Sequence, residues 1–408
     1  MRGFAHRQTV DAALAWLDGQ LHPLSAEEVP LRLAAGRVLA GSVVSDVDVP
    51  GFDRSAMDGY AVRANSTEGA TSSNPLPLAV IGDSMPGSPF EGSVAAGEAV
   101  RIMTGAPMPR EADAVVPAEW VGAAGPGASH QIFAKAAVSP GRNVGRRGED
   151  IASGTALLHS GRMLRPQDLG VLSSVGHATV GVVRQPRVRL AVTGNELLPW
   201  GTPPRDFHIA DANGPMLAAL IERDGGVVDF PGLVSDNRTE ILAALESDAD
   251  IVIVTGGSSV GIEDFVPMLL AERGELAVHG IAMRPGSPTG LGRMAHRLVF
   301  LLPGNPVSSL CAYDFFAGRA VRALGGRTKT WPYREMRGRL NREISSQIGR
   351  LDYARVRIAD GMVEPLAIAG ASILSSTTRA DGFVVIDDDS EGFAAGAEVQ
   401  VWLYGMKP

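Results

Sequence analysis

The stretch "DIVIVTGGSSVGIEDFVP", residues 250–267, decides the class of fold. It begins with a short apolar run rich in β-branched residues, which is typical of a buried strand. Two glycines end the run, and "FVPMLLAERGE", residues 265–275, continues with a helical pattern. Buried strands that alternate with helices indicate a parallel sheet covered on both faces. The sequence therefore predicts an α/β domain around this stretch.

The same alternation extends to both sides of that stretch. Apolar strands are predicted at "RVRLAVTG", residues 187–194, and at "RLVFLLPGN", residues 297–305. Helical patterns occupy "GPMLAALIERDGG" (214–226), "TEILAALESDA" (239–249) and "PVSSLCAYDFFAGRAVRALGG" (306–326). Together these segments predict a doubly wound sheet.

The remaining chain is patterned differently. Helices are predicted at residues 9–21 and 31–40, short β-like segments from about 75 to 160, and helical character again at 165–176, as expected for one domain interrupted by another. Residues 331–408 return to a β-like pattern typical of a small barrel or sandwich. The expected architecture is multidomain α/β: residues 1–48 with 155–183 as a discontinuous helical or mixed domain I, 49–154 as a β-rich domain II, 184–328 as the α/β domain III, and 329–408 as a β-barrel-like domain IV.

Composition narrows the classes of function. The 408 residues are 45% hydrophobic and 20% charged, and charges or turn residues interrupt every apolar run, so no membrane span is expected. The net charge of −8, without a long basic tract, argues against a nucleic-acid partner. The single cysteine, Cys311, fits a reducing cytoplasm and falls in an apolar helical pattern. We expect a cytoplasmic protein that acts on a small molecule.

Three loops follow the predicted strands of the α/β domain: "TGNEL" (193–197), "TGGSSVGIED" (255–264) and "PGNPVSS" (303–309). Ligands of such sheets bind beyond the carboxyl ends of the strands, where glycine allows close approach and helix N-termini favour anions. A fourth loop, "MRPGSPTG" (283–290), adds Arg284, which suits an oxyanion. One such loop is usually only a turn, but the set predicts an anion pocket.

Carboxylates lie in or beside these loops. Glu196, Asp236 and Asp264 would supply the oxygen ligands that Mg²⁺ prefers. Each has a structural alternative: Asp264 would favour a helix N-terminus by its charge, and Asp236 would cap a helix. The scattered histidines and the absence of GxSxG give no support to a zinc site or a nucleophile elbow.

The β-rich segment carries a second polar group in three turns. "FDRSAMDGYAV" contains Asp58, "RIMTGAPMP" contains Thr104, and "NVGRRGEDI" contains Asp150. These turns would form either one wall of a cleft or simple surface ion pairs, which contribute little to stability.

In this order, the motifs resemble the molybdopterin molybdenumtransferase family, which includes the C-terminal domain of gephyrin. They are "FDRSAMDGYAV", "RIMTGAPMP", "GRNVGRRGEDI", "VTGNEL", "DANGPML", "VTGGSSVGIEDF", "RPGSPTGLG" and "LPGNPVSS", and they run through nearly the whole chain. Each motif alone is weak, whereas the ordered set is specific.

The resemblance implies four domains, a third domain with the pterin-binding fold of molybdopterin adenylyltransferases, and a homodimer. It implies Mg²⁺-dependent insertion of molybdenum from molybdate into adenylylated molybdopterin, with release of AMP. A molybdopterin adenylyltransferase is an implied partner.

The resemblance also assigns site residues. Matched by motif, the catalytic set is Asp58, Thr104, Asp150, Glu196, Asp236 and Asp264, of which Glu196, Asp236 and Asp264 also hold the metal. The matched ligand-binding set is Gly256, Gly257, Ser258, Ser259, Gly261, Arg284, Ser287, Pro303, Gly304, Asn305, Pro306, Ser308 and Arg350.

The chain departs from the family pattern where cations are expected. The usual "KPGKP" is "RPGSP" here. Arg284 therefore has a planar guanidinium group where the family has the compact ammonium of a lysine, and Ser287 replaces a second lysine. Gly280 and Gly145 stand where the family often has a lysine and an arginine. Fewer cations would weaken the binding of a dianion. Two alternatives therefore stay open: a pterin- or nucleotide-binding paralogue that is non-catalytic or of altered specificity, and a dimeric scaffold.

Overall fold

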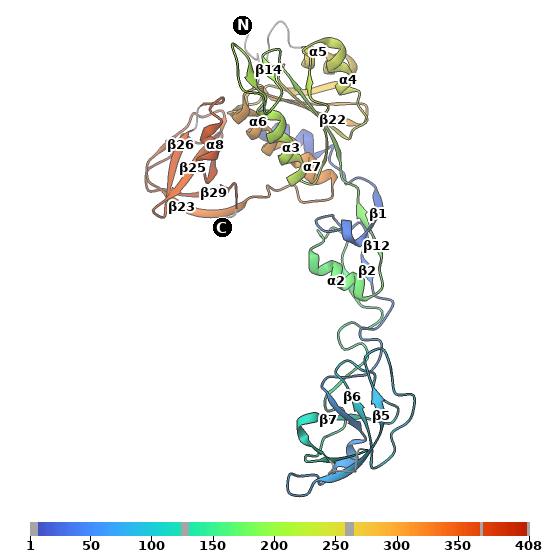
Figure 1. Cartoon of the computed structure of the whole chain (residues 1–408). Coiled ribbons are helices and arrows are strands. Elements are labelled where there is room, and N and C mark those ends of the chain that lie inside the picture. The colour runs from blue at the N-terminus through green and yellow to red at the C-terminus, as the bar shows by residue number, and fades with distance from the viewer. Residues whose placement is uncertain (1–6, 124–129, 258–264, 368–369, 406–408) are drawn as a thin grey trace. The chain divides into compact units, whose positions relative to one another are not determined.

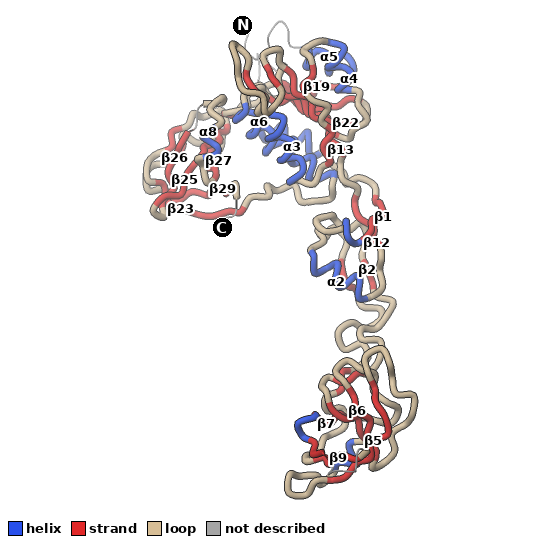
Figure 2. Tube along the Cα trace, in the orientation of Figure 1, coloured by secondary structure: helices blue, strands red, loops and turns tan. Residues whose placement is uncertain are grey.

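A computed structural model describes residues 7–123, 130–257, 265–367 and 370–405. The chain divides into two compact units. Unit 1 comprises residues 1–28, 36–40 and 181–408, and unit 2 comprises residues 29–35 and 41–180. Figures 1 and 2 show the elements of each unit. No helix in the described ranges is long and apolar enough to cross a membrane.

Unit 1 contains the α/β sheet that the sequence predicts, and the predicted fold class is confirmed. Its strand order is β16-β13-β18-β22-β21-β19, with β17 also paired to β13. Strands β16, β17, β13, β18 and β22 are parallel, whereas at one edge β21 pairs antiparallel with β22, and β19 pairs antiparallel with β21. The bounds are β13 Arg187–Thr193, β16 Val227–Asp229, β17 Leu233–Val234, β18 Ile251–Thr255, β19 Glu275–His279, β21 Gly290–Met294 and β22 Arg297–Leu302.

Helices cover both faces of this sheet because its central strands are apolar on both sides. In β18, Ile251 and Ile253 belong to one core with helices α1, α3, α6 and α7, while Val252 and Val254 belong to a second core with α4 and α5. The bounds are α1 Val10–Asp18, α3 Asn213–Arg223, α4 Arg238–Leu245, α5 Phe265–Arg273, α6 Pro306–Ala312 and α7 Gly318–Leu324, with a π-helical turn at Tyr313–Ala317. The continuous apolar run predicted for a doubly covered strand is thereby explained.

The C-terminal part of unit 1 is a closed barrel, the first of the two forms that the sequence allows. The strand order β25-β26-β23-β29-β27 closes through a pairing of β27 with β25. The short strand β20, Met283–Arg284, joins β25 in parallel and links the "RPGSP" loop to the barrel. The bounds are β23 Arg334–Leu340, β25 Leu351–Ala359, β26 Met362–Ala367, β27 Gly382–Ile386 and β29 Glu398–Leu403, with helix α8 Ser375–Thr378 and the small pair β24 Ile344–Ser345 and β28 Gly392–Phe393.

Unit 2 is built around a β sheet of order β7-β4-β6-β5-β9-β8. Alternate residues of β4 enter two cores: Ala61 lies in one and Val62 in the other. The bounds are β4 Gly59–Val62, β5 Leu76–Ser84, β6 Glu98–Ile102, β7 Ala114–Pro117, β8 Val121–Ala123 and β9 Gln131–Ala134, followed by helix α2 Pro166–Ser174. Short pairs join β3 Arg54–Ser55 to β10 Val144–Gly145 and β2 Val43–Val44 to β11 Ala156–Leu158.

The predicted helix at residues 31–40 is wrong. The chain instead forms strand β1, Ala26–Pro30, which pairs with β12, Thr179–Val183, and then only a 3₁₀ turn at Leu31–Leu33. Gly36 lies within the predicted helix and has a left-handed φ of 76°, which an α-helix does not contain. The apolar spacing marks buried positions here without specifying a helical backbone.

Candidate functional site

A cavity of about 480 Å³ lies at the carboxyl edge of the parallel sheet in unit 1. Its walls come from the ends of β13 and β18 and from the loop between β22 and α6. The sequence predicts that loops after these strands share one edge, and the structure places them together. The lining consists of residues 192–194, 196–197, 209–213, 236, 255–257, 304–306 and 372.

Gly256 allows two of these loops to meet. Its φ is 95°, and a Cβ atom built there would lie 1.9 Å from the carbonyl oxygen of Thr193. The close approach therefore requires glycine for both conformational and steric reasons. The backbone of β18 is brought directly against the end of β13, which shapes the cavity floor.

Asn213 ties the loops together from the start of α3. Its Nδ2 donates to the hydroxyl of Thr255 at 3.0 Å and to the carbonyl of Gly304 at 2.8 Å. Thr255 in turn donates to the carbonyl of Pro303 at 3.2 Å. Buried hydrogen bonds of this kind hold the strand ends in one arrangement before any ligand binds.

The carboxylates that line the cavity are those of Glu196, Asp211 and Asp236. The capping role considered for Asp236 is filled by Asn237, whose side chain accepts the backbone N–H of Glu240 at 3.0 Å. An oxygen of Asp236 lies 3.6 Å from the position of a Cβ built at Gly257. Asp236 therefore lies beside the glycine loop, close to where a metal ion or a phosphate group would bind.

Asp211 is a cavity residue that the sequence reasoning missed. It is 4% exposed, and burial raises the pKa of its carboxyl group above the usual value. Its Oδ1 accepts the backbone N–H of Gly214 at 2.9 Å. The signal was present in "DANGPML", a motif used for the resemblance without assigning roles to its residues.

Apart from Arg284 and Ser287, the predicted site residues of domain III fall into three groups. Seven of them line the cavity: Glu196, Asp236, Gly256, Gly257, Gly304, Asn305 and Pro306. Pro303 contributes a carbonyl behind the cavity wall, and Ser308 is buried in α6 without lining it. Four predicted residues lie outside the described ranges: Ser258, Ser259, Gly261 and Asp264.

The donor chemistry at this edge suits a hard cation. Glu196 and Asp236 offer carboxylate oxygens, which Mg²⁺ prefers. Within the described ranges, no three acidic, histidine or cysteine side chains are grouped closely enough to hold a metal. The third member of the predicted metal set, Asp264, is outside those ranges.

Arg284, Ser287 and Arg350 do not line the cavity. Arg284 donates to the buried carboxylate of Asp352 through Nε at 3.1 Å and Nη2 at 2.5 Å, and Arg350 pairs with the same carboxylate at 3.2 Å. Ser346 also donates to Asp352, at 2.7 Å. Two guanidinium groups thus share one carboxylate, and Asp387, Asp388 and Asp389 lie beside the intervening Leu351.

The predicted residues of unit 2 lie on exposed turns. Asp58 accepts both the backbone N–H and the hydroxyl of Thr104, at 2.8 and 2.7 Å, and these bonds hold the pKa of Asp58 below its usual value. Asp150 is exposed, and its carboxylate has no partner among the described residues. The three residues are therefore on the same unit, with Asp58 and Thr104 in direct contact.

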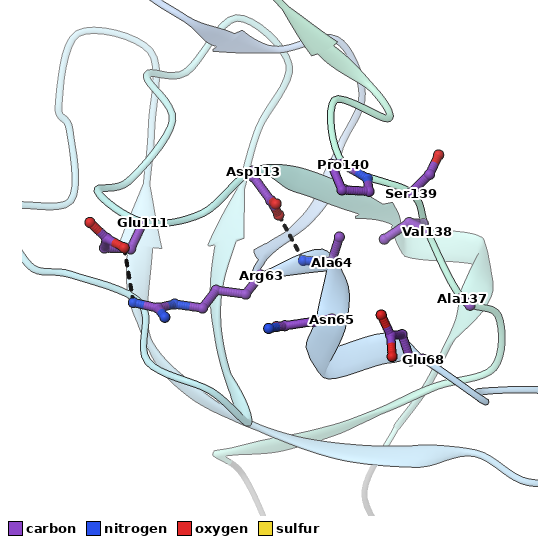
Figure 3. Close-up of a pocket in the computed structure, with 10 residues that line it drawn as sticks. All are labelled: Arg63, Ala64, Asn65, Glu68, Glu111, Asp113, Ala137, Val138, Ser139 and Pro140. Carbon is purple, nitrogen blue, oxygen red and sulfur yellow. Dashed lines mark hydrogen bonds and ion pairs between the residues drawn. The ribbon is translucent and has the colours of Figure 1, made fainter.

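Unit 2 also has a larger hollow, of about 700 Å³, beside the turn Ala64–Thr67 (Figure 3). Three of its charged groups are paired, because Arg63 contacts Glu111 at 3.1 Å and Asp113 accepts the backbone N–H of Ala64 at 2.7 Å, whereas the carboxylate of Glu68 has no partner among the described residues. None of the predicted site residues lines it. We therefore place the candidate site in the smaller cavity of unit 1, where buried polar groups converge.

Comparison with known proteins agrees with the motifs. Residues 8–176 match the MoeA N-terminal region (domain I and II), residues 190–323 a probable molybdopterin binding domain, and residues 337–404 the MoeA C-terminal region (domain IV).

Full-length relatives and solved structures extend these matches. The chain is 36% identical over 388 residues to molybdopterin molybdenumtransferase 2 of Mycobacterium tuberculosis, covering 92% of this chain and 94% of the relative. It is 34% identical over 405 residues to molybdopterin molybdenumtransferase of Haemophilus influenzae, covering 96% and 98%. A crystal structure of the molybdopterin biosynthesis MoeA protein from a Pyrococcus species has a TM-score of 0.84 at 33% identity, covering 98% of this chain and 100% of that chain. The chain therefore belongs to the molybdopterin molybdenumtransferase family, a family of transferases of molybdenum cofactor biosynthesis.

Proposed function

We propose that this enzyme inserts molybdenum from molybdate into adenylylated molybdopterin, in a Mg²⁺-dependent reaction that releases AMP. The observation that carries the proposal is the meeting of three strand-end loops around one cavity, with Glu196 and Asp236 in its wall. A cavity of about 480 Å³ is within the usual range for small-molecule sites. The family membership supplies the class of reaction.

Each part of the cavity has a role in this proposal. The glycine loop at Gly256 and Gly257 offers backbone N–H groups and close approach, which suits the phosphates of the adenylylated substrate. Glu196 and Asp236, with Asp264, would hold Mg²⁺, which when bound would neutralise charge on the phosphoanhydride. The same carboxylates orient water toward that bond.

The two guanidinium groups of Arg284 and Arg350 on the single carboxylate of Asp352 support a place for the molybdate dianion near that cluster. Ser287 in place of a lysine lowers the charge available to it. We therefore propose weaker molybdate binding than a lysine-containing relative would show. The proposal also includes a homodimer in the cytoplasm that receives its substrate from a molybdopterin adenylyltransferase, and Asp58, Thr104 and Asp150 as contributors from unit 2.

The test is release of AMP by purified protein supplied with adenylylated molybdopterin, Mg²⁺ and molybdate. AMP should appear only when molybdate and Mg²⁺ are both present. Asp236→Asn should lower the rate at least ~100-fold, because a metal-positioning carboxylate is lost. Asp248→Asn is the matched control, since Asp248 is 88% exposed just before β18, at the opposite edge of the same sheet.

The outcomes separate this function from its alternatives. Tight binding of the pterin substrate without AMP release would favour a non-catalytic carrier. If the protein bound neither substrate, the result would favour a dimeric scaffold. Equal rates for Asp236→Asn and the control would remove Asp236 from the mechanism.

A further inference from the structure

One buried carboxylate joins the "RPGSP" loop to the barrel. Asp352 lies near the start of β25, directly opposite Arg284 of β20 in the strand register, and its side chain is 0% exposed. The neighbouring backbone is paired as well, because the N–H of Leu351 donates to the carbonyl of Ala282 at 2.9 Å. Main-chain and side-chain bonds together therefore fix the carboxylate against the loop.

Asp352 contacts two arginines through the same oxygen. Nε of Arg284 lies 3.1 Å from Oδ1 and Nε of Arg350 lies 3.2 Å from it, while Nη2 of Arg284 donates to Oδ2. Two guanidinium groups that meet at one point repel each other, so the carboxylate between them is needed to keep them there. Ser346 donates to Oδ2 at 2.7 Å and so orients the carboxylate.

This arrangement leaves donors of both guanidinium groups for a ligand. Nη1 of Arg284 and both terminal nitrogens of Arg350 have no partner within the described ranges. The two side chains are 33% and 28% exposed, so solvent reaches them. A guanidinium group offers its donors in one rigid plane, which suits an oxyanion with several acceptor oxygens.

We propose that Asp352 is a positioning residue for the oxyanion substrate, which holds Arg284 and Arg350 together as one binding pair. This inference rests on the proposed function, which supplies molybdate as that oxyanion. Although Asp352 is negatively charged, its removal weakens the binding of a dianion. Without it the two guanidinium groups repel each other, and the acidic run at residues 387–389, beside Leu351, offers them other partners.

The first test is calorimetric titration of the full-length protein with molybdate. Asp352→Asn preserves the shape of the side chain and removes its charge. Net charge alone predicts that this variant binds a dianion more tightly, whereas loss of the positioned pair should weaken molybdate binding at least ~10-fold. Asp248→Asn is the matched control, because it removes an exposed carboxylate elsewhere in unit 1, and it should bind molybdate as the wild type does.

Steady-state kinetics separates positioning from a purely structural role. Asp352→Asn should raise the KM for molybdate at least ~10-fold and leave the KM for adenylylated molybdopterin within ~2-fold. Ser346→Ala is a milder second variant, which removes one hydrogen bond to Asp352 without a change of charge. It should raise the KM for molybdate ~3-fold, and it decides the question if Asp352→Asn does not fold.

Molybdate binding by Asp352→Asn that equals or exceeds that of the wild type would overturn the inference. An equal rise in both KM values would also overturn it, since a general loss of structure affects both substrates. If the wild type bound no molybdate, the inference would fail too. Release of AMP by the wild type decides the proposed function separately, so that function can stand when the role of Asp352 fails.

Discussion

Two carboxylates of unit 2 and two of unit 1 lie in opposite environments. In unit 2, Asp53 and Asp58 accept backbone N–H groups on exposed turns, from Arg147 and Thr104 respectively, and these bonds lower their pKa values. In unit 1, burial raises the pKa values of Asp211 and Asp314. An exposed carboxylate with its bonds complete stabilises a turn, whereas a buried one with an oxygen left over needs a ligand or a proton.

The largest difference between the two units is expected when one glycine of each is replaced by alanine. Gly256→Ala should destabilise unit 1 by at least about 3 kcal/mol and abolish AMP release, because the new Cβ would meet the Thr193 carbonyl in addition to the left-handed backbone strain. Gly105→Ala in unit 2 has a similar φ, 82°, but open space around it. It should cost only about 1–2 kcal/mol. Thermal unfolding of each variant measures both effects, and equal losses would contradict the steric argument.

The next effect is a dependence on pH that comes from Asp314. This residue is fully buried, accepts the Tyr333 hydroxyl at 2.8 Å, and burial raises the pKa of Asp314 to about 6 from an ordinary value of 3.8. The folded state therefore holds the proton more tightly, so ionisation lowers stability as pH rises from about 4 through 6. The loss should be roughly 1–3 kcal/mol.

Asp314→Asn should flatten this dependence, which is measured as the difference in unfolding midpoint between variant and wild type from pH 4 to 7. Carboxylates with lowered pKa values, such as Asp53, have the opposite sign: their contribution is present above the unfolded pKa and is lost as pH falls. A difference curve for Asp314→Asn that sloped in the same direction as one for Asp53→Asn would contradict the assignment.

The smallest effect is expected on the surface of unit 2. Asp53 pairs with Arg146 at 2.7 Å, but the two side chains are 38% and 58% exposed, so water and salt screen the pair. Asp53→Asn should change the free energy of unfolding by less than about 1 kcal/mol. A denaturant titration at low and high salt measures this change in the free energy of unfolding. A loss comparable to that of Gly256→Ala would contradict a minor role for the surface ion pair.

Much of the fold follows from sequence pattern. The run "IVIVT" is typical of a strand covered on both faces, and the alternation around it predicts the parallel sheet that the structure contains. The helix expected at residues 31–40 was wrong because periodicity marks buried positions without choosing the backbone that buries them, and the left-handed backbone of Gly36 interrupts a helix there.

The sequence predicted which loops form the candidate site, but not which individual atoms make contacts there. Strand ends of one parallel sheet must share an edge, so the meeting of the loops that carry Glu196, Gly256 and Asn305 follows from topology. Asp211 was missed because an aspartate before a helix is usually a cap, and only the packing reveals which of its oxygens is free. Arg284 stays a predicted oxyanion contact, and only the structure reveals that the barrel strand β25 places Asp352 against it.

By itself, the sequence determined the order of the elements, the apolar cores and the family, because hydrophobic period and ordered motifs are local properties of the chain. Only the tertiary structure decided which polar atoms are satisfied. A hydrogen bond depends on which partner arrives from a distant segment, as Gly304 does for Asn213 across the sheet edge. The difference between a capped turn and an open ligand pocket is therefore made by long-range packing.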